Sequence, residues 1–487
     1  MTLLLLVLVA TTAAVVGIVA RERERIATTV GFVGLLLTLV LAIALTPGQS
    51  VEIGGSTLVT TEFMRLFTIL AAFTSIVLAT VGLAAGTRRD ATAASLGIIV
   101  TGAVTLAIVD PRVAVIAATA GGAVASLLTL TPATGRVGTS VGIRVLRASI
   151  IAGVMAIAAT AWIGRDLSEL AAQPVVFGLA YLAFALAVAL RAGAIPFHTW
   201  AARLTDSVPE SALPMITAWS PAAIAVVCLA WTDASIAPLL VDLDSVRFVV
   251  TVIALMTVVL GALAAWIQDD IEHMVGYSII GDTGLILLAI AALDPEAWAS
   301  GRIWLLGFVM SRSAFAAWAA AARSTYLTGR IGDLRGWAIR SPLLGLTFVL
   351  VVLASIGLPG LAIFEARVGL VGLNFDGPLA TIVLLATLAP LAYYIRLGVI
   401  GVGRPEPGPA PGGGRRPEIG PLDVTDLAGW GSRTWSDNRA FTATGATLLL
   451  AVVAVVVSAG GVGVTEAAVS GPPTGNPAVE SFAPEGL

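Results

Sequence analysis

The sequence contains no lysine, so arginine fills all 27 of the lysine-plus-arginine positions in this 487-residue chain. Genomic base composition is the simplest explanation, and the chemical consequence is the same whatever the cause. Arginine keeps its proton in proteins, whereas a buried lysine can release its proton near neutral pH. The chain therefore has no lysine amine that could relay protons through an apolar interior.

Cysteine is almost as scarce. The single cysteine, Cys228, excludes an intramolecular disulfide and a cysteine metal cluster, and its apolar surroundings in the sequence predict a small buried hydrophobe. The sequence also has no nucleotide-binding glycine motif, haem-attachment motif or iron–sulfur cysteine set. We therefore predict no cofactor and no metal, and any redox chemistry would belong to partner proteins.

Charge of either sign is rare. Charged residues make up 12 % of the chain and hydrophobic residues 57 %, with a mean hydropathy of +0.97. Soluble domains carry about 25 % charged residues, so this chain is predicted to be an all-α integral membrane protein whose solvent is a lipid bilayer. The net charge of −3 gives no reason to expect a nucleic-acid partner.

Apolar runs long enough to span a bilayer recur along the chain, since a spanning helix needs about 20 mostly apolar residues. We predict fourteen transmembrane helices, near residues 2–20, 26–46, 63–86, 91–109, 113–130, 148–164, 174–195, 212–231, 247–267, 275–293, 303–322, 342–371, 378–400 and 441–462. The first lacks a preceding basic segment and is followed directly by "RERER", so we expect a retained helix rather than a signal peptide.

The arginines are distributed unevenly between the two sets of loops. Eighteen lie in loops after odd-numbered spans, and five are assigned to loops after even-numbered spans or to the first residues that follow such a loop: Arg65, Arg112, Arg165, Arg247 and Arg302. The remaining four fall within spans: Arg191, Arg312, Arg367 and Arg396. Because positively charged loops stay cytoplasmic, both termini are predicted to be external.

Ionisable side chains within spans are functional candidates, since burying one at mid-bilayer costs at least about 2.5–3.5 kcal/mol. The first cluster lies in "LRAGAIPFHTWAARLTDSVPESALP" and contains Arg191, Pro196, His198, Asp206 and Glu210. Proline removes a backbone donor and clashes with the preceding turn, so the helix is predicted to break at Pro196. Backbone freed at that depth is tolerated only against protein or a water-filled cavity.

A second interrupted span contains Pro359, Gly360, Glu365 and Arg367. Its proline lies 163 residues after Pro196, and a pair of Pro-interrupted spans is typical of inverted-repeat transporters. We predict three N-terminal helices in residues 1–90 and two inverted five-helix repeats, each with a broken helix, in residues 91–231 and 247–400. The alternative is a pair of kinks filled by ordinary packing.

Two further clusters lie in the second predicted repeat. In "IQDDIEHMVGYSIIGDTG", residues 269–272 are expected to form a solvated turn, whereas Asp282 lies within the next span. His273 fits a titrating group or a hydrogen-bonding helix end equally well. Arg312 falls near mid-span and is expected to be buried and paired.

The C-terminal region is predicted to contain a flexible cytoplasmic linker rich in proline, glycine and arginine at residues 401–440. A last helix at 441–462 would follow. Residues 463–487 are predicted to form a disordered external tail.

These motifs resemble the antiporter-like membrane subunits of respiratory complex I, multi-subunit cation/proton antiporters and membrane-bound hydrogenases. The resemblance rests on "RAGAIPFHTWAARLTD", "QDDIEHMVGYSIIGDTG", "TGRIGDLRGW" and "LPGLAIFEAR", and it covers about residues 90–400. It implies that Arg191 stands at the position of the family's seventh-helix lysine and Arg367 at the key ionisable position of the twelfth helix. It also implies other membrane subunits as partners and the plasma membrane of a prokaryote as the location.

The chain departs from that family in ways that bear on function. The fifth span has no counterpart of the family's glutamate, and two further lysine positions fall near Ala222 and Ala316. Three functions remain open. The first is a proton-translocating subunit of a complex I-like NADH-quinone oxidoreductase or hydrogenase-type assembly, with a pathway through Arg191, His198, Asp206, Glu210, Asp282, Arg312, Glu365 and Arg367. The others are a cation/proton antiporter subunit and a non-pumping membrane scaffold.

Overall fold

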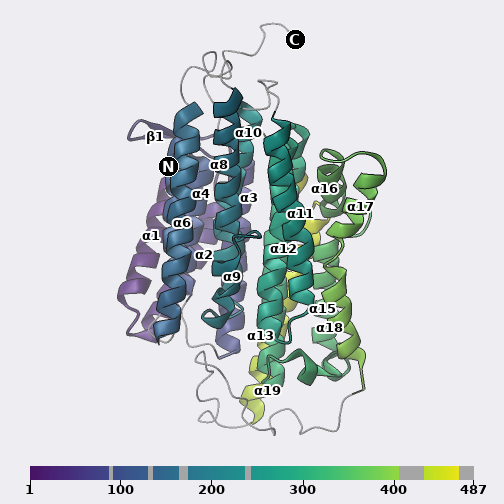
Figure 1. The fold of residues 1–487 in the computed structure, drawn as a ribbon. Helices are drawn as coiled ribbons and strands as arrows, with labels where there is room; N and C mark the ends of the chain where they lie inside the picture. The colour runs from purple at the N-terminus through teal and green to yellow at the C-terminus, as the bar shows by residue number, and fades with distance from the viewer. Residues whose placement is uncertain (87–90, 130–134, 164–173, 236–242, 405–432, 471–487) are drawn as a thin grey trace.

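The computed structural model describes residues 1–86, 91–129, 135–163, 174–235, 243–404 and 433–470, and these residues are almost entirely helical. The long helices stand side by side as one bundle (Figure 1). Within these described ranges, eleven helices are long and apolar enough to cross a membrane, and three shorter apolar helices accompany them. The predicted all-α membrane architecture is confirmed. The number of fourteen spans stays a prediction, because three of them fall on the shorter helices.

The first half of the chain forms one side of the bundle. Its elements are α1 (Thr2–Val19), α2 (Glu24–Ile43), β1 (Ser50–Ile53), β2 (Ser56–Val59), α3 (Glu62–Ala84), α4 (Thr92–Ala107), α5 (Pro111–Leu127), α6 (Gly135–Ile163), α8 (Pro174–Ala192), α9 (Thr199–Ala202), the 3-10 turn η2 (Leu204–Asp206), the π-helical turn η3 (Met215–Trp219) and α10 (Ser220–Ser235). The antiparallel hairpin pairs Ser50 with Val59 and Ile53 with Ser56, a feature that hydropathy did not predict.

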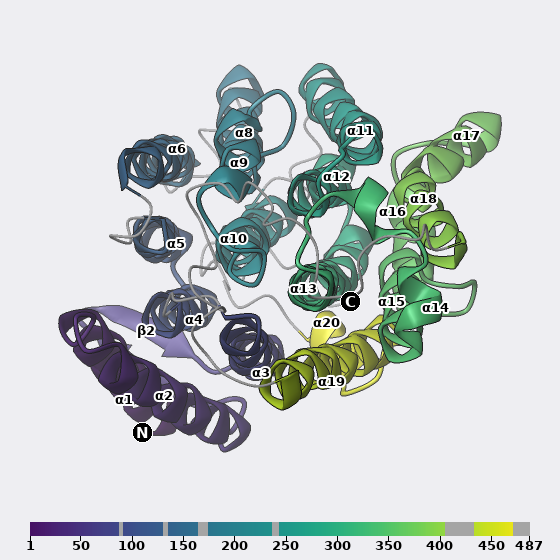
Figure 2. The same cartoon turned by 90° about the horizontal axis from the view of Figure 1, so that it is seen from below.

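The second half forms the other side. Its elements are α11 (Asp244–Trp266), α12 (Ile271–Ala292), α13 (Glu296–Tyr326), η5 (Ile331–Leu334), α14 (Trp337–Arg340), α15 (Pro342–Ile356), α16 (Ala362–Gly372), α17 (Gly377–Thr387), α18 (Leu391–Val402), α19 (Arg433–Ser458) and α20 (Val464–Val469). Seen from below, α5, α6, α8 and α10 are grouped apart from α15, α16 and α18, with α12 and α13 between them (Figure 2). Helix α19 packs against α3, α13 and α15 and so joins the two halves.

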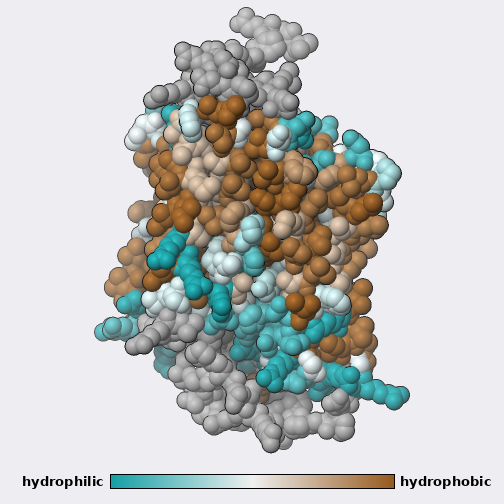
Figure 3. All heavy atoms as spheres, viewed as in Figure 1, coloured by the Kyte–Doolittle hydropathy of each residue, from teal (hydrophilic) through white to brown (hydrophobic). Residues whose placement is uncertain are grey.

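The outer surface is largely aliphatic. Hydrophobic side chains cover much of the face in Figure 3, and hydrophilic side chains gather toward its lower end. Leu8, Val154, Phe248 and Val399 are among the exposed apolar residues, and lipid rather than water suits such a surface. The chain is therefore a multi-pass membrane protein.

Small residues bring α11 and α12 into close contact. A Cβ atom added to Gly261 would lie 2.5 Å from the Cα atom of Gly281, so this crossing requires glycine. The next residue, Asp282, is thereby held in the interior. Cys228 is also fully buried and free, which confirms its predicted role as a small hydrophobe.

Several elements differ from the sequence predictions in where they begin and end. Helix α6 begins at Gly135 rather than near residue 148, and the thirteenth span consists of two helices that end and begin around Pro390. The prediction of a disordered tail is wrong for Val464–Val469, which form α20 because Val464 and its apolar neighbours are buried against α13 and α3. Residues 405–432 of the predicted linker and 471–487 of the tail lie outside the described residues.

Candidate functional site

The first predicted helix break is present between α8 and α9. Helix α8 ends at Ala192, Gly193 adopts a φ of 70° that favours glycine, and the peptide bond between Ile195 and Pro196 is cis. The backbone freed by the break finds partners within the protein. The amide of Ile195 donates to Thr257 Oγ1 at 3.1 Å, and Trp200 Nε1 donates to the Leu190 carbonyl at 2.9 Å. The break is thus packed against protein, as the depth argument requires.

Arg191 lies directly before this break and is almost completely buried, with 2 % of its side chain exposed. Its Nη2 atom donates to Ser220 Oγ on α10, and its guanidinium carbon lies 6.0 Å from the Trp200 ring centroid. Its Nε and Nη1 atoms have no hydrogen-bond partner among the described residues. A Cβ atom added to Gly122 on α5 would lie 2.9 Å from Nε, so a glycine there makes room for the guanidinium.

The other ionisable residues of the first cluster, His198, Asp206 and Glu210, make their contacts with residues other than Arg191. His198 is half-buried, and its ring centroid lies 6.4 Å from that of Tyr277 on α12. Asp206 Oδ1 lies 3.2 Å from Nε2 of His273. Glu210 is buried and accepts a hydrogen bond from Arg323 Nη1 at 3.0 Å. The segment after the break is therefore tied to α12 and α13 in the second half of the chain.

Arg323 joins two acids that the sequence analysis had treated separately. It donates both to Glu210 and to Glu272, and only 18 % of the Glu272 side chain is exposed. The expectation that residues 269–272 form a solvated turn is therefore wrong for Glu272. Arg323 itself was assigned to a loop, but it lies in the last turn of α13. A basic residue directly after the end of a predicted span was the available signal.

The second predicted break separates α15 from α16. Helix α15 ends at Ile356, and both Gly357 and Gly360 have positive φ values, of 73° and 90°. Arg367 on α16 is 1 % exposed and reaches back across the break. Its Nη1 atom donates to the Ile356 carbonyl at 2.6 Å, and its Nη2 atom donates to the Ser355 carbonyl at 3.2 Å. The guanidinium thus satisfies carbonyl groups that the end of α15 leaves without helical partners.

Glu365 does not join this buried site. Its side chain is exposed, and its Oε1 atom accepts a hydrogen bond of 3.0 Å from the Gly360 amide. The carboxylate therefore holds the backbone of the break in place from the exposed surface of the protein. Its place in the interior pathway stays a prediction without a supporting contact in the structure.

Asp282 and Arg312 form a buried ion pair. The Arg312 side chain is 0 % exposed and that of Asp282 is 5 % exposed, and Arg312 Nε donates to Asp282 Oδ2 at 2.6 Å. Arg312 Nη1 also donates to the hydroxyls of Tyr393, at 2.9 Å, and Tyr394, at 2.7 Å. The predicted burial and pairing of Arg312 are confirmed. The two tyrosines were missed, although the chain has only five and these two are adjacent within a predicted span.

The ion pair and the second break form one polar network. The Tyr394 hydroxyl donates to Ser355 Oγ at 2.8 Å, and the carbonyl of Ser355 accepts from Arg367. A continuous chain of polar groups therefore runs from α12 through α13 and α18 to the break. Carboxyl and hydroxyl groups can carry protons, whereas the two arginines supply fixed positive charge. We refer to Asp282, Arg312, Tyr393, Tyr394, Ser355 and Arg367 as the second-half network.

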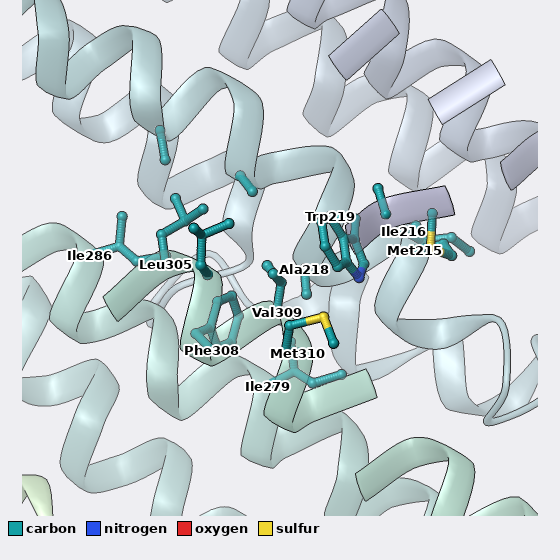
Figure 4. Close-up of a cluster of buried hydrophobic side chains, with 14 of the residues drawn as sticks. Met215, Ile216, Ala218, Trp219, Ile279, Ile286, Leu305, Phe308, Val309 and Met310 are labelled. Atoms are coloured by element: carbon teal, nitrogen blue, oxygen red, sulfur yellow. The ribbon is translucent and has the colours of Figure 1, made fainter. Parts of the chain in front are cut away.

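An apolar cluster adjoins, along the chain, both the serine partner of Arg191 and the second-half network. It brings together side chains from η3, α12 and α13, namely Met215, Ile216, Ala218, Trp219, Ile279, Ile286, Leu305, Phe308, Val309 and Met310 (Figure 4). Trp219 precedes the serine that contacts Arg191, and its Nε1 atom donates to Ser313 Oγ at 3.1 Å, next to Arg312. Ala222 and Ala316, at two of the lysine positions of the resembled family, are also fully buried.

Arg302 requires a correction, because it was assigned to a loop and lies inside α13 with 0 % exposure. Its Nη2 atom donates to the Ala467 carbonyl at 2.8 Å, and its Nη1 atom donates to the Ser470 carbonyl at 2.7 Å. Its guanidinium carbon also lies 4.0 Å from the Phe63 ring centroid. The sequence could not reveal this, because the partners follow about 165 residues later in a segment without strong hydropathy.

Known proteins resemble this chain in sequence and in fold. The profile of the family described as "NADH:quinone oxidoreductase/Mrp antiporter, TM" matches residues 142–391, more than half of the chain. NADH-quinone oxidoreductase subunit N 1 of Streptomyces griseus is 30 % identical over 239 residues, which are 48 % of each chain. The subunit of the same name from Acidiphilium cryptum is 32 % identical over 228 residues, which are 46 % of this chain and 45 % of the relative. The matched region thus spans about half the length of these curated relatives.

Solved structures extend the likeness to nearly the whole chain. A chain of the Mrp complex from Dietzia sp. has a TM-score of 0.73 at 18 % identity, covering 96 % of this chain and 95 % of that one. A chain of respiratory complex I from Thermus thermophilus has a TM-score of 0.72 at 19 % identity, covering 99 % of both. At such identities the likeness establishes the fold.

Proposed function

The chain belongs to the NADH:quinone oxidoreductase/Mrp antiporter transmembrane family, and from this membership we propose that it is a proton-translocating membrane subunit of a complex I-like or hydrogenase-type assembly. Other membrane subunits of that assembly are its partners, and the redox chemistry takes place on them. Relatives named NADH-quinone oxidoreductase subunit N support the complex I-like assignment.

The second-half network is the observation that carries this proposal. A buried carboxylate and two buried guanidinium groups are expensive to keep inside a membrane protein, and such groups mark ion pathways. An arginine close to a carboxylate favours the ionised form of that acid. A shift of Arg312 away from Asp282 toward Tyr393 and Tyr394 would therefore let Asp282 take up a proton, and its return would release the proton. The hydroxyls and Ser355 continue the route toward the break.

A non-pumping scaffold is the second candidate, and it is favoured by the first half of the chain. There Arg191 has a serine as its partner, and α5 contains no acid. A cation/proton antiporter is the third possibility from the sequence. It is less well supported, because the buried charges of the network are two arginines to one acid, and Arg312 already contacts the Asp282 carboxylate.

The deciding experiment measures proton translocation by the native complex carrying Asp282→Asn, purified and reconstituted into vesicles. We expect translocation to fall at least about tenfold while the complex still assembles, because the amide removes the proton-carrying group. Asp269→Asn is the matched control, since the side chain of Asp269 is 91 % exposed. If the assembled Asp282→Asn complex translocates protons at the wild-type rate, the proposed pumping role is wrong and the scaffold is favoured.

We also propose a topology in the plasma membrane of a prokaryote with both termini external, on the strength of the arginine asymmetry. The division into helices of residues 1–90 and repeats at 91–231 and 247–400 belongs to the same proposal. A reporter fused after residue 410 should report a cytoplasmic location, and one at the C-terminus an external location. Two reporters on the same side would remove a span from the proposed topology.

A further inference from the structure

Arg191 is a buried charge with little compensation from the protein. Its guanidinium makes one hydrogen bond, to Ser220 Oγ, and two of its three nitrogens lack a partner in the described part of the chain. Arg302 and Arg367 each leave one nitrogen unpaired, and each donates to two backbone carbonyls. Removing a cation from water without a counter-charge is strongly unfavourable. Something other than a described side chain must therefore offset the charge of Arg191.

The helices around Arg191 carry no acid at its level. Helices α5, α6 and α8 contain neither aspartate nor glutamate, and the one acid of α10, Asp233, lies 13 residues after Ser220, about 20 Å along the helix. Helices α11 and α12 also pack against α8. The acid of α11, Asp244, is its first residue, and the two acids within α12, Glu272 and Asp282, are paired with Arg323 and Arg312.

The immediate surroundings of Arg191 have the chemistry of an anion site. A Cβ atom on Gly122 would meet Ser149 Oγ at 2.7 Å and Arg191 Nε at 2.9 Å, so the serine, the glycine backbone and the guanidinium converge. Ser220 Oγ provides a second hydroxyl, and the two hydroxyls donate to the carbonyls of Val145 and Gly121. The donors left for an anion are therefore Nε and Nη1 of Arg191, and a guanidinium binds an anion through charge-assisted hydrogen bonds. The close packing at Gly122 favours a small anion over a phosphate or a bulky carboxylate.

The helix break brings exposed residues close in sequence to Arg191. Pro196 and Thr199 are exposed, while Trp200, one residue further on, packs within 6.0 Å of the Arg191 guanidinium. His198 lies between them, half-buried, and its Nδ1 atom also has no partner in the described structure. The break therefore runs from exposed residues to the neighbourhood of Arg191 and carries a second unpaired polar group.

We propose that Arg191 binds a small monovalent anion of the halide class, which enters at the break of residues 193–199. The anion supplies the counter-charge that no acid of α5 provides. This site goes beyond the proposed function, because it exists whether or not the chain translocates protons, and both tests below are read without turnover.

The first test compares the thermal unfolding midpoint of the purified full chain in chloride and in gluconate at constant ionic strength. Chloride should raise the midpoint along a saturating curve, because a ligand of the folded state stabilises it by mass action. Arg191→Gln should abolish the rise, and the matched substitution Arg302→Gln should preserve it. A wild-type midpoint that is equal in both salts, or an equal chloride response in Arg191→Gln, would overturn the proposal.

The second test uses Trp200 as a reporter and does not depend on the folding of an Arg191 variant. The difference in fluorescence between the wild-type chain and Trp200→Phe isolates the emission of Trp200. Bromide quenches tryptophan at short range, so this component should be quenched along a saturating curve and recover when chloride competes. Quenching of the Trp200 component that stays linear in bromide and insensitive to chloride would contradict a bound anion.

Discussion

The two interrupted helices each carry a buried arginine, and the two arginines are satisfied in different ways. At the second break, Arg367 donates to two carbonyls at the end of α15 and is linked through Ser355 and Tyr394 to the ion pair of Arg312 and Asp282. At the first break, Arg191 contacts one serine across from a glycine of α5. The second half thus contains its own counter-charge, whereas no acid among the described residues of the first half forms an ion pair with Arg191.

A helix break in each half of the chain therefore does not mean that the two buried arginines are compensated by the same kind of partner. A break exposes carbonyl groups, and a cation that reaches them needs no acid. Arg367 follows its break in sequence and folds back over the end of α15. Arg191 precedes its break, and the carbonyl of Leu190 accepts from Trp200 instead. The order of arginine and break along the chain decides which partners are within reach.

The largest expected effect concerns the ion pair of Arg312 and Asp282, which gives the second half its own counter-charge. Arg312→Gln leaves Asp282 buried without its counter-charge and removes the donor to both tyrosines. We expect a loss of about 3–5 kcal/mol in the free energy of unfolding. Chemical unfolding of the purified chain in detergent measures it, with Arg396→Gln as a partly exposed control. A loss below about 1 kcal/mol would mean that the ion pair contributes little to the second half.

A smaller effect compares the two breaks directly by the same substitution. Arg367→Gln withdraws donors from the Ile356 and Ser355 carbonyls, and leaving buried acceptors unpaired costs about 1–3 kcal/mol each. Arg191→Gln removes one hydrogen bond, worth about 0.5–1.5 kcal/mol, and also removes an uncompensated charge. In gluconate buffer, unfolding should therefore show Arg367→Gln as the more destabilised of the two. The reverse order would break the comparison.

The smallest effect concerns the acid outside the network. Glu365 is exposed and bonds the Gly360 amide, so Glu365→Gln keeps an acceptor at that position. We expect unfolding to change by less than about 0.5 kcal/mol and proton translocation by the reconstituted complex to stay near the wild-type rate. A severe loss of translocation in assembled complex would return Glu365 to the pathway and place a route on the outer side of the second break.

Part of the site could be predicted from the sequence. The breaks at Pro196 and at Pro359–Gly360 follow from backbone chemistry, and both are present. The burial of Asp282 and Arg312 follows from their place within apolar runs, and it is confirmed. Arg302 was misplaced because its helix extends seven residues before the predicted span at 303–322, to Glu296. Tyr393 and Tyr394 were missed because an aromatic residue within a span is ordinary unless its hydroxyl has a charged partner.

The amino-acid sequence by itself determined that this chain folds in lipid, that it folds as helices, and where two of those helices are interrupted. These properties depend on local hydropathy and on the backbone chemistry of proline and glycine. Both are determined by residues that are close together in the sequence. Only the tertiary structure decided which charge has which partner: Asp282 for Arg312, α15 carbonyls for Arg367, Ala467 and Ser470 for Arg302, and a lone hydroxyl for Arg191. The reason is that hydrogen bonds act over about 3 Å, and packing alone brings such distant segments that close.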